Sequence, residues 1–432
     1  MAIDNKDKKV LKSSIEREQN EVACSAECEK IKGSKNLNVP HLRFPEFSGE
    51  WEEHTLSEYL EFKNGLNPDA KRIGSGLPFI SVMDILSEGV INYDNIRGKV
   101  NATEKEIECF GVKDGDLLFQ RSSETLEDVG RANVYMDNRT AIYGGFVIRG
   151  RKIGNYDPLF FKYLLATPLA RKRTCRMGAG AQHFNIGQEG LSKISLYFPS
   201  IEEQRKIAEF LSLIDERIAT QNKIIEDLKK LKSAIIERHY NQAEKQTVFI
   251  ADLGEPFNVG NLSKDDLSET GKPCIIYGEL FTTYGETISQ VESHTNKKEG
   301  MTLSKKGDLL FPTSTTVDAI SLIAPSFINI DGVILGGDMF GIHINPNYNA
   351  QYLSYYFNHI ANRQLAKYAK GSTIIHLHYT DIENAKLLLP SLEEQNRMAK
   401  CLVSLDAKIN IENIFISLLK SQKIYFLYQM FI

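Results

Sequence analysis

One stretch of this sequence carries residues of the kind that hold phosphates and read base edges. It has no acidic residue in its basic part and runs through Arg171, Lys172, Arg173 and Arg176 to Gln182. Lysine and arginine pair with phosphates, and arginine or glutamine can make paired hydrogen bonds to guanine or adenine. Glycines at 178 and 180 would let the backbone approach a ligand closely. The stretch therefore has the chemistry of a DNA contact.

A second basic stretch occupies the equivalent place in the other half of the chain. Its polar and basic members are Arg363, Lys367, Lys370 and Thr373. Each stretch alone fits equally well a solvated helix end, where cations are favoured by the helix dipole. Their recurrence at matching places favours the DNA interpretation.

A further pair of candidate DNA-binding segments follows two copies of the sequence Gly-Asp-Leu-Leu-Phe. The first copy is followed by Gln120, Arg121 and Ser122, and the second by Thr313 and Ser314 after a proline. These segments differ between the copies, as two surfaces that read different short sequences would. Arg121 is the strongest candidate among them for a base contact.

Catalytic and metal-binding patterns are missing. No Pro-Pro pair occurs to form the turn that holds a target amine in an amino-methyltransferase, and Gly271-Lys272 runs into Pro273 where a phosphate-binding loop needs Ser or Thr. Cys24 and Cys28 form the one close cysteine pair, without a second ligand pair to complete a zinc site. We therefore expect a non-catalytic protein with no cofactor and no bound metal.

The elements that position these residues come from an internal duplication. The segment Leu196–Gln204 (LYFPSIEEQ) returns 191 residues later as Leu387–Gln395 (LLLPSLEEQ). Gly115–Phe119 returns 192 residues later as Gly307–Phe311. Similar offsets over several landmarks, including the Gly-Gly pairs at 144 and 336, indicate two diverged copies of one structural unit.

Each copy ends in a long amphipathic helix. Apolar residues spaced by four and three define the first, namely Ile207, Leu211, Ile214, Ile218, Ile225 and Leu228, continued by Ile235 after a small slip. The second repeats them as Met398, Leu402, Leu405, Ile409, Ile416, Leu419 and Phe426. Such spacing is typical of a coiled coil. In an antiparallel pair, the polar Gln221 and Glu412 would lie near each other and help to set the register; two unrelated helices packed on their own domains are the alternative.

The sequence thus predicts an α+β protein in five parts. These are a charged leader (1–39), a first globular domain (40–199), a central spacer helix (200–243), a second globular domain (244–390) and a C-terminal spacer helix (391–432). We expect bent, mostly antiparallel sheets, one helix per domain (Pro158–Arg173 and Ala350–Tyr368), and an antiparallel coiled coil that relates the halves by a pseudo-two-fold axis.

Bulk composition limits the class of protein. The 432 residues exceed one ordinary domain, and 42% hydrophobic with 25% charged residues is typical of globular proteins. No apolar run is long enough to span a membrane, and the charged first residues do not resemble a signal peptide. We expect a cytoplasmic protein without membrane contact. The net charge of −4 requires any DNA surface to be local.

These motifs together resemble those of the specificity subunit of type I restriction-modification systems. The resemblance rests on the repeated Pro-Ser-apolar-Glu-Glu-Gln starts of the long helices, on Gly115–Ser123, and on Val39–Phe47 with Gly49–Trp51, and it covers residues 39–432. The leader has no counterpart in that pattern. The resemblance implies two target-recognition domains, a complex on double-stranded DNA with two modification subunits that methylate adenine from S-adenosylmethionine, and restriction subunits that translocate and cut DNA.

We therefore interpret the chain as a DNA-recognition subunit that reads a bipartite, asymmetric target and docks adenine methyltransferase subunits. One alternative is a coiled-coil scaffold with two protein-binding heads, which the acidic net charge favours. Another is an enzyme that uses scattered Asp and His residues. Salt-sensitive binding to duplex DNA distinguishes the first alternative, and turnover of nucleic acid by the pure chain distinguishes the second.

Overall fold

The computed structural model of the chain describes residues 38–180, 183–297 and 299–432. The expected leader, its cysteines Cys24 and Cys28, and Gln182 lie outside the described residues, except for the leader's last two positions. The chain divides into two compact units. The first unit comprises the chain up to Glu216 together with Ser421–Ile432, and the second comprises Arg217–Lys420.

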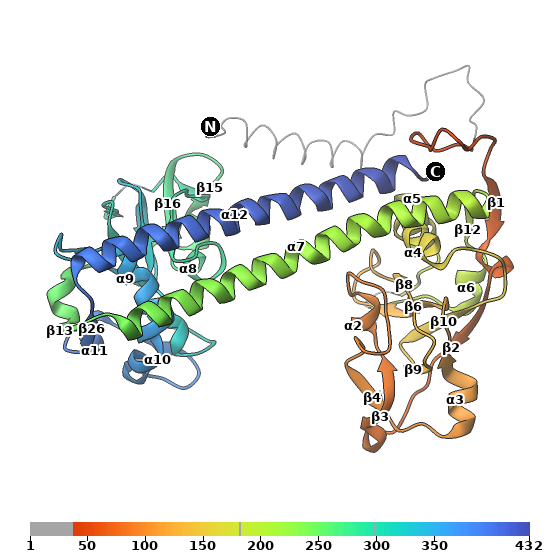
Figure 1. Cartoon of the computed structure of the whole chain (residues 1–432), viewed down its shortest axis with the longest axis horizontal. Coiled ribbons are helices and arrows are strands. Elements are labelled where there is room, and N and C mark those ends of the chain that lie inside the picture. The colour runs from red at the N-terminus through yellow and green to blue at the C-terminus, as the bar shows by residue number, and fades with distance from the viewer. Residues whose placement is uncertain (1–37, 181–182, 298) are drawn as a thin grey trace. The chain divides into compact units, whose positions relative to one another are not determined.

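Two four-stranded sheets form the globular part of the first unit (Figure 1). In sheet order, the first contains β2 (Leu60–Asn64), β10 (Val147–Lys152), β6 (Leu117–Gln120) and β8 (Ala132–Val134). The second contains β4 (Gly98–Val100), β3 (Ile73–Ile80), β9 (Ala141–Tyr143) and β5 (Gly111–Val112). Two short ladders complete the unit: β1 (Glu52–Thr55) with β12 (Ser195–Phe198), and β7 (Ser122–Ser123) with β11 (Phe184–Asn185). Its short helices are α2 (Val82–Ile85), α3 (Glu104–Phe110), α4 (Pro158–Ala166), α5 (Pro168–Arg176) and α6 (Gln188–Ser192).

The second unit repeats this arrangement with five-stranded sheets. The first contains β14 (Gly254–Asn258), β24 (Met339–Ile344), β20 (Asp308–Pro312), β22 (Ser326–Ile328) and β17 (Thr287–Ile288). The second contains β15 (Leu267–Ser268), β18 (His294–Thr295), β16 (Lys272–Ile276), β23 (Ile334–Gly336) and β19 (Thr302–Leu303). Its ladders pair β13 (Gln246–Phe249) with β26 (Lys386–Leu389), and β21 (Ser314–Thr315) with β25 (Ile375–His376). Its short helices are α8 (Glu279–Thr282), α9 (Ala350–Tyr356), α10 (Asn362–Leu365) and α11 (Tyr379–Ile382). In both units most strand pairs are antiparallel, as predicted; the parallel pairs in the described chain are β3 with β9, β16 with β23, and β17 with β22.

The repeated Gly-Asp-Leu-Leu-Phe sequence forms the same turn and buried strand in each unit. Gly115 and Gly307 have φ angles of +80° and +102°, which favour glycine. The aspartate that follows each glycine is buried and accepts a hydrogen bond from a backbone N–H three residues earlier, at Lys113 in one unit and Lys305 in the other. The three apolar residues that follow, Leu117–Phe119 and Leu309–Phe311, are all buried. Such a continuous apolar run is typical of a strand that is covered on both faces.

The expected single helix of the first domain is broken in the structure. Thr167 separates α4 from α5 with an extended ψ of 154°, and Pro168 begins the second helix. Proline lacks a backbone N–H and disfavours the helical conformation of the residue before it, so the break has a local cause. In the second unit α9 continues without a break through a π-helix (Phe357–Ala361) into α10.

The glutamine of each Glu-Glu-Gln sequence fixes the start of a long helix to its own domain. Gln204 donates a hydrogen bond to the carbonyl of Pro199 and accepts one from the N–H of Asp157, the residue that caps α4. Gln395 makes the equivalent bonds to Pro390 and Asn349. Both side chains are buried, so their polar groups need these partners.

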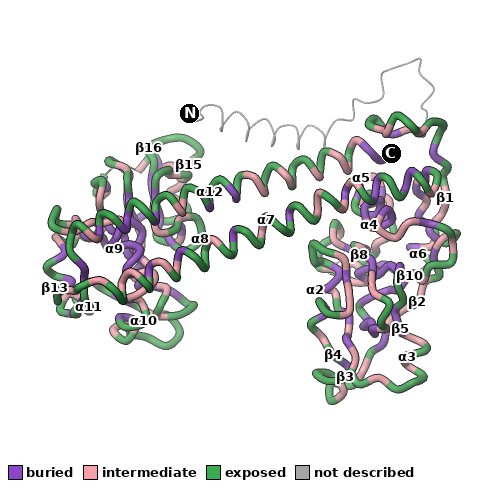
Figure 2. The backbone as a smooth tube through the Cα atoms, in the orientation of Figure 1, coloured by how far each residue is buried: buried purple, intermediate pink, exposed green. Residues whose placement is uncertain are grey.

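The long helices are α7 (Ile201–Gln242) and α12 (Leu392–Gln429), as the repeat predicted. Each unit contains a part of α7 and a part of α12, and the two parts pack antiparallel. In the first unit Phe210 contacts Phe426. In the second unit the side chain of Gln221 donates a hydrogen bond to Glu412. The predicted register contact is thereby confirmed. The a and d positions of the helices are buried or half-buried (Figure 2). Beyond Leu228 the buried positions are Lys232 and Ile236, whereas the predicted Ile235 is half-buried.

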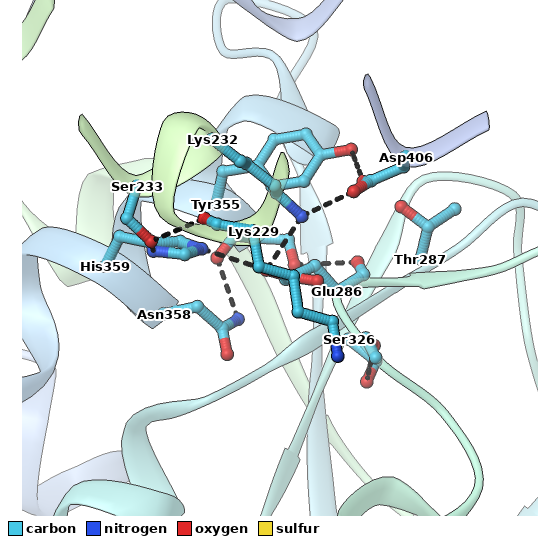
Figure 3. Close-up of polar contacts among 12 residues, drawn as sticks. Lys229, Lys232, Ser233, Glu286, Thr287, Ser326, Tyr355, Asn358, His359 and Asp406 are labelled. Carbon is cyan, nitrogen blue, oxygen red and sulfur yellow. Dashed lines mark hydrogen bonds and ion pairs between the residues drawn. The ribbon is translucent and has the colours of Figure 1, made fainter. Parts of the chain in front are cut away.

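A polar cluster joins α7 and α12 to the globular part of the second unit (Figure 3). The Nζ atom of Lys232 lies 2.6 Å from Asp406 Oδ1 and 3.0 Å from Glu286 Oε1. The hydroxyl of Tyr355 donates to Asp406 at 2.6 Å, and His359 bonds to Glu286 at 2.9 Å. Through the buried ammonium group of Lys232, the cluster connects α7 with α12 and with the loop that carries Glu286.

The first unit contains the same Lys-Asp-Tyr arrangement. Lys423 of α12 lies 2.5 Å from Asp215 of α7, which accepts a hydrogen bond of 2.8 Å from Tyr163 of α4. Each residue is the copy, at an offset of 191 or 192 residues, of one in the other cluster. Because the helices run antiparallel, each cluster takes its lysine from the long helix that its aspartate does not occupy.

No helix in the described part of the chain is long and apolar enough to cross a membrane.

Candidate nucleic-acid interface

Strand register gathers several loops at one edge of the first sheet in the first unit. Ile148 pairs with Asn64, and Val147 pairs with Gln120, so the end of β2, the end of β6 and the start of β10 lie side by side. Phe119 pairs with Ala132, which adds the start of β8. We call this edge, with its residues Asn64, Gln120–Ser122, Arg131 and Gly145–Phe146, the loop edge of the first unit.

The second unit has the same edge. Asn258 pairs with Phe340 and Pro312 pairs with Met339, which places the end of β14, the end of β20 and the start of β24 together. The loop edge of the second unit is defined by Asn258, Thr313–Ser314 and Asp338. The predicted segments Gln120–Ser122 and Thr313–Ser314 therefore occupy equivalent places on equivalent edges.

A glycine hairpin lies next to each loop edge. In the first unit the backbones of Ala179 and Asn185 exchange two hydrogen bonds of 2.9 Å, and in the second Lys370 and His376 do the same at 2.9 and 2.7 Å. The strands β11 and β25 of these hairpins pair with β7 and β21, which begin in the loop edges at Ser122 and Ser314. The predicted contact residue Gln182 follows Gly180 by two positions in the sequence and lies outside the described residues.

Each hairpin requires its glycine. Gly180 and Gly371 have φ angles of +145° and +113°. A Cβ atom at Gly180 would lie 2.0 Å from the carbonyl oxygen of His183, and one at Gly371 would lie 2.1 Å from that of Ile374. The two glycines thus meet the same kind of backbone contact in both units, whereas the residues around them differ.

Gln120 and Arg121 of the first loop edge are held by backbone carbonyls, and Ser122 by a side chain. Gln120 is buried and donates to the carbonyl of Ser122, but its Oε1 atom has no hydrogen-bond partner among the described residues. Arg121 is half-buried and donates from Nη1 to the carbonyl of Gly145 at 3.3 Å. Its remaining guanidinium donors are the ones available to a ligand. Ser122 bonds to Asn185 of the hairpin, which connects the edge to the hairpin.

The predicted basic stretch divides into structural and free residues. Arg171 donates to the carbonyls of Glu127 and Val129, and burial lowers the pKa of its guanidinium. Arg173 forms an ion pair of 2.8 Å with Glu53 and bonds to Ser195. Lys172 and Arg176 are exposed, and Arg176 ends α5 two residues before the hairpin glycines begin. The exposed pair is therefore the better candidate for phosphate contacts.

The second basic stretch is more dispersed. Lys370 lies in the hairpin but forms an ion pair of 2.5 Å with Asp381, and Thr373 is exposed at the hairpin tip. Lys367 is exposed one turn before the hairpin. Arg363 lies farther back, where it lines a polar hollow beside α7 that also includes Ser233 and Glu237. The structure brings Lys370, Thr373, Thr313 and Ser314 to one region, whereas Arg363 lies apart from it.

Asn64, Asn258, Phe146 and Asp338 are loop-edge residues that sequence reasoning missed. Their positions depend on strand register, which pairs residues more than fifty positions apart. The repeated Gly-Gly pairs at 144 and 336 were a usable signal because each directly precedes one of these residues. Among the described residues no group of His, Cys, Asp or Glu side chains could hold a metal ion.

Comparisons with known proteins identify the architecture. The family model for the type I restriction modification DNA specificity domain matches residues 48–230 and 242–420. The putative type I restriction enzyme MjaX specificity subunit of Methanocaldococcus jannaschii is 24% identical over 406 residues, covering 88% of this chain and 92% of that protein. The MjaVIII specificity subunit of the same organism is 24% identical over 409 residues, covering 88% of this chain and 91% of that protein.

A solved structure shares the fold. The crystal structure of a type I restriction-modification system S subunit from M. genitalium matches with a TM-score of 0.55 at 15% identity, covering 91% of this chain and 99% of that one. A second structure, from a study of the assembly of a type I restriction-modification system, matches with a TM-score of 0.54 at 14% identity and covers 87% of this chain and 96% of that one. The chain therefore belongs to the family of type I restriction-modification DNA specificity subunits.

Proposed function

We propose that each unit reads one part of a bipartite, asymmetric DNA target through its loop edge and glycine hairpin. Membership of the specificity family implies DNA target recognition. The observation that carries the proposal is that the same edge is built twice on the same backbone pattern with different side chains. Two equivalent surfaces that differ in chemistry suit a target whose halves differ in sequence.

Within the first unit we assign separate roles to the exposed and the half-buried cations. Lys172 and Arg176 lie beside the hairpin and suit phosphate contacts, which position a protein without reading sequence. Arg121 is held at the loop edge by Gly145 and suits a base contact, because a guanidinium fixed in orientation can pair with a guanine edge. In the second unit Thr313, Ser314 and Thr373 supply the corresponding polar groups.

We infer that the long helices serve as spacers and as docking surfaces for modification subunits. Residues 200–243 and 391–432 would then be the spacers that follow domains 40–199 and 244–390. A helix of 42 residues such as α7 has a length of about 60 Å. Both long helices expose apolar side chains, which mark protein contacts when they lie close together; they include Leu213, Ile224, Leu231, Ile411, Leu418 and Tyr425. Two repeats would accommodate two modification subunits, with restriction subunits joining the complex.

In this proposal the chain contributes binding and no catalysis. Methyl transfer to adenine would belong to the modification subunits, which supply S-adenosylmethionine chemistry. The sequence has no amine-holding Pro-Pro turn and no phosphate-binding loop that would support either reaction. Methyl transfer by the purified chain supplied with S-adenosylmethionine would contradict this assignment.

The proposed function is tested by sequencing methylated bases in cells that produce the chain with its modification subunits. We expect one motif made of two unlike blocks separated by a fixed stretch that is not read. A single uninterrupted block, or methylation without sequence preference, would overturn the bipartite proposal. Binding of the purified complex to duplex DNA should also weaken steeply with salt, which a protein scaffold would not show.

A further inference from the structure

Phe146 is a large apolar residue that the loop edge of the first unit leaves exposed. Its side chain is 68% exposed, although it lies between the buried Tyr143 and the buried Val147. Burial of an aromatic ring is favourable, so a fold that exposes one at a loop forgoes that stabilisation. A single exposed apolar residue is common on protein surfaces. Two further observations indicate a binding role for Phe146: the fixed backbone around it and the residue at the equivalent position of the other unit.

The backbone on either side of Phe146 is fixed. The carbonyl of Phe146 accepts a hydrogen bond of 2.9 Å from the N–H of Arg121, and Val147 donates 2.9 Å to Gly144. A Cβ atom at Gly145 would lie 1.7 Å from Oδ1 of Asn67, so the loop also packs closely against the segment after β2. A loop fixed from two sides holds the backbone of Phe146 at one place on the loop edge, with the side chain exposed.

The second unit places an aspartate at the equivalent position. Asp338 follows Phe146 by 192 residues, and its carbonyl accepts a hydrogen bond of 2.8 Å from Thr313, just as Phe146 accepts one from Arg121. Gly337 has a φ of +91° and donates 3.0 Å to Gly260, so this loop is fixed as well. The Asp338 carboxylate is exposed and accepts a hydrogen bond of 2.8 Å from Ser314. One backbone site thus carries an apolar ring in one unit and an anion in the other.

The aspartate distinguishes two ways in which this position could face DNA. Against a phosphate, a carboxylate is repelled. Against the base edges of the major groove, the same carboxylate can accept a hydrogen bond from an exocyclic amino group, and a phenyl ring can contact the methyl group of thymine. Both residues therefore suit base edges, whereas Asp338 does not suit the phosphate backbone.

We propose that positions 146 and 338 are specificity-determining positions of the two units. Phe146 contacts a thymine methyl group in one block of the target, and Asp338 accepts from the amino group of cytosine or adenine in the other. This inference rests on the proposed function, because it requires that the loop edges face DNA.

The test is a map of methylated bases in cells that produce the modification subunits with the chain or with one of its variants. Phe146→Ala should relax the motif at one position of one block, with discrimination for thymine falling by up to about 5- to 150-fold, the usual cost of one mismatched base pair. Phe146→Leu should retain much of the preference, because leucine still offers an apolar surface. Asp338→Asn should change one position of the other block, since its amide can also donate.

Matched controls come from exposed residues at the opposite edge of each sheet. Ile153 follows β10 at the end away from Phe146 and is 60% exposed. Asp331 is exposed and accepts a hydrogen bond from the N–H of Lys306, near the start of β20. Ile153→Ala and Asp331→Asn should leave both blocks of the motif unchanged.

The outcomes separate this inference from the proposed function. The unaltered chain is expected to direct methylation to a bipartite motif. If Phe146→Ala and Asp338→Asn then give the same motif, positions 146 and 338 do not read bases and the inference is overturned. If the unaltered chain gives no sequence-specific motif, the proposed function itself fails. A motif that changes equally with the Ile153 variant would overturn the inference too, because the effect would then not depend on the loop edge. Equal thermal midpoints for the variant chains establish that changes in motif do not arise from unfolding.

Discussion

Replacement of Lys232 provides a quantitative test of the polar cluster in the second unit (Figure 3). The Lys232 side chain is only 6% exposed and serves two carboxylates, Glu286 and Asp406. Its ammonium group also lies 4.7 Å from the centre of the Tyr355 ring. In Lys232→Met a side chain of similar length replaces it, so the packing is largely kept while both carboxylates lose their shared cation.

The expected loss of stability is worked out from the pKa of Glu286. Burial alone would raise the pKa of Glu286, but the hydrogen bond with His359 and the nearby charge of Lys232 outweigh burial and lower it from 4.5 to about 2. At about 1.4 kcal/mol per pKa unit, this shift corresponds to roughly 3 kcal/mol of stability. Because the pKa is lower in the folded state, the contribution is full above pH 4.5 and is lost as the pH falls through about 2.

Lys232 supplies only part of this shift, since the His359 hydrogen bond remains in Lys232→Met, but Lys232 also neutralises Asp406. We therefore expect Lys232→Met to lower the free energy of unfolding at pH 7 by about 3 kcal/mol, the low end of the range found when one partner of a buried ion pair is removed. The measurement is urea denaturation followed by circular dichroism. Lys230→Met is the control, since the contact of 3.8 Å that Lys230 on the same helix makes with Asp227 is exposed. Its effect should stay within about 1 kcal/mol.

Two further variants decide whether the unpaired carboxylates cause the loss. Glu286→Gln in the Lys232→Met background should recover part of the stability, because it removes one unpaired buried charge. Lys423→Met should cost less than Lys232→Met, since Lys423 contacts the single carboxylate of Asp215 in the first unit. The reasoning is refuted if Lys232→Met and Lys230→Met have equal stability, or if Glu286→Gln destabilises the Lys232→Met protein further.

Three other predictions concern one hairpin, the end of α5 and the helix pair. Gly371→Ala should weaken DNA binding by the complex in fluorescence anisotropy, because its Cβ would lie 2.1 Å from the carbonyl oxygen of Ile374; unchanged affinity would show that the hairpin does not contact DNA. Arg176→Ala should lower affinity for all sequences alike and reduce the slope of log affinity against log salt by about 1; a change of motif would instead make it a base contact. Glu412→Leu should lower the thermal midpoint because it leaves the buried amide of Gln221 without its partner, and adding Gln221→Leu should restore it; additive losses would contradict this.

Much of the architecture was predictable from local sequence pattern. Apolar residues at intervals of four and three define α7 and α12 because a helix turns every 3.6 residues, and the same spacing places Gln221 and Glu412 on the facing sides. The two copies were visible because turns and helix starts need particular residues, such as Gly115 with its φ of +80°. The break before Pro168 also follows a local rule, which the prediction of one continuous helix overlooked.

Which polar residues remain free to bind was decided by the tertiary structure. In sequence Arg171, Arg173 and Arg176 look alike, yet Arg173 pairs with Glu53, which lies 120 residues away, and Arg171 donates to backbone carbonyls more than forty residues away. Lys232 lies in a lysine-rich run that is typical of a solvated helix face. In the structure its side chain is buried and paired with Glu286 and Asp406. The loop edges arise in the same way, since strand register brings Asn64 beside Ile148 and Gln120 beside Val147. Helical periodicity and turn formation depend on residues that are a few positions apart, so the sequence alone predicts them. Burial and charge pairing depend on which distant segments of the chain fold against each other, so only the tertiary structure determines them.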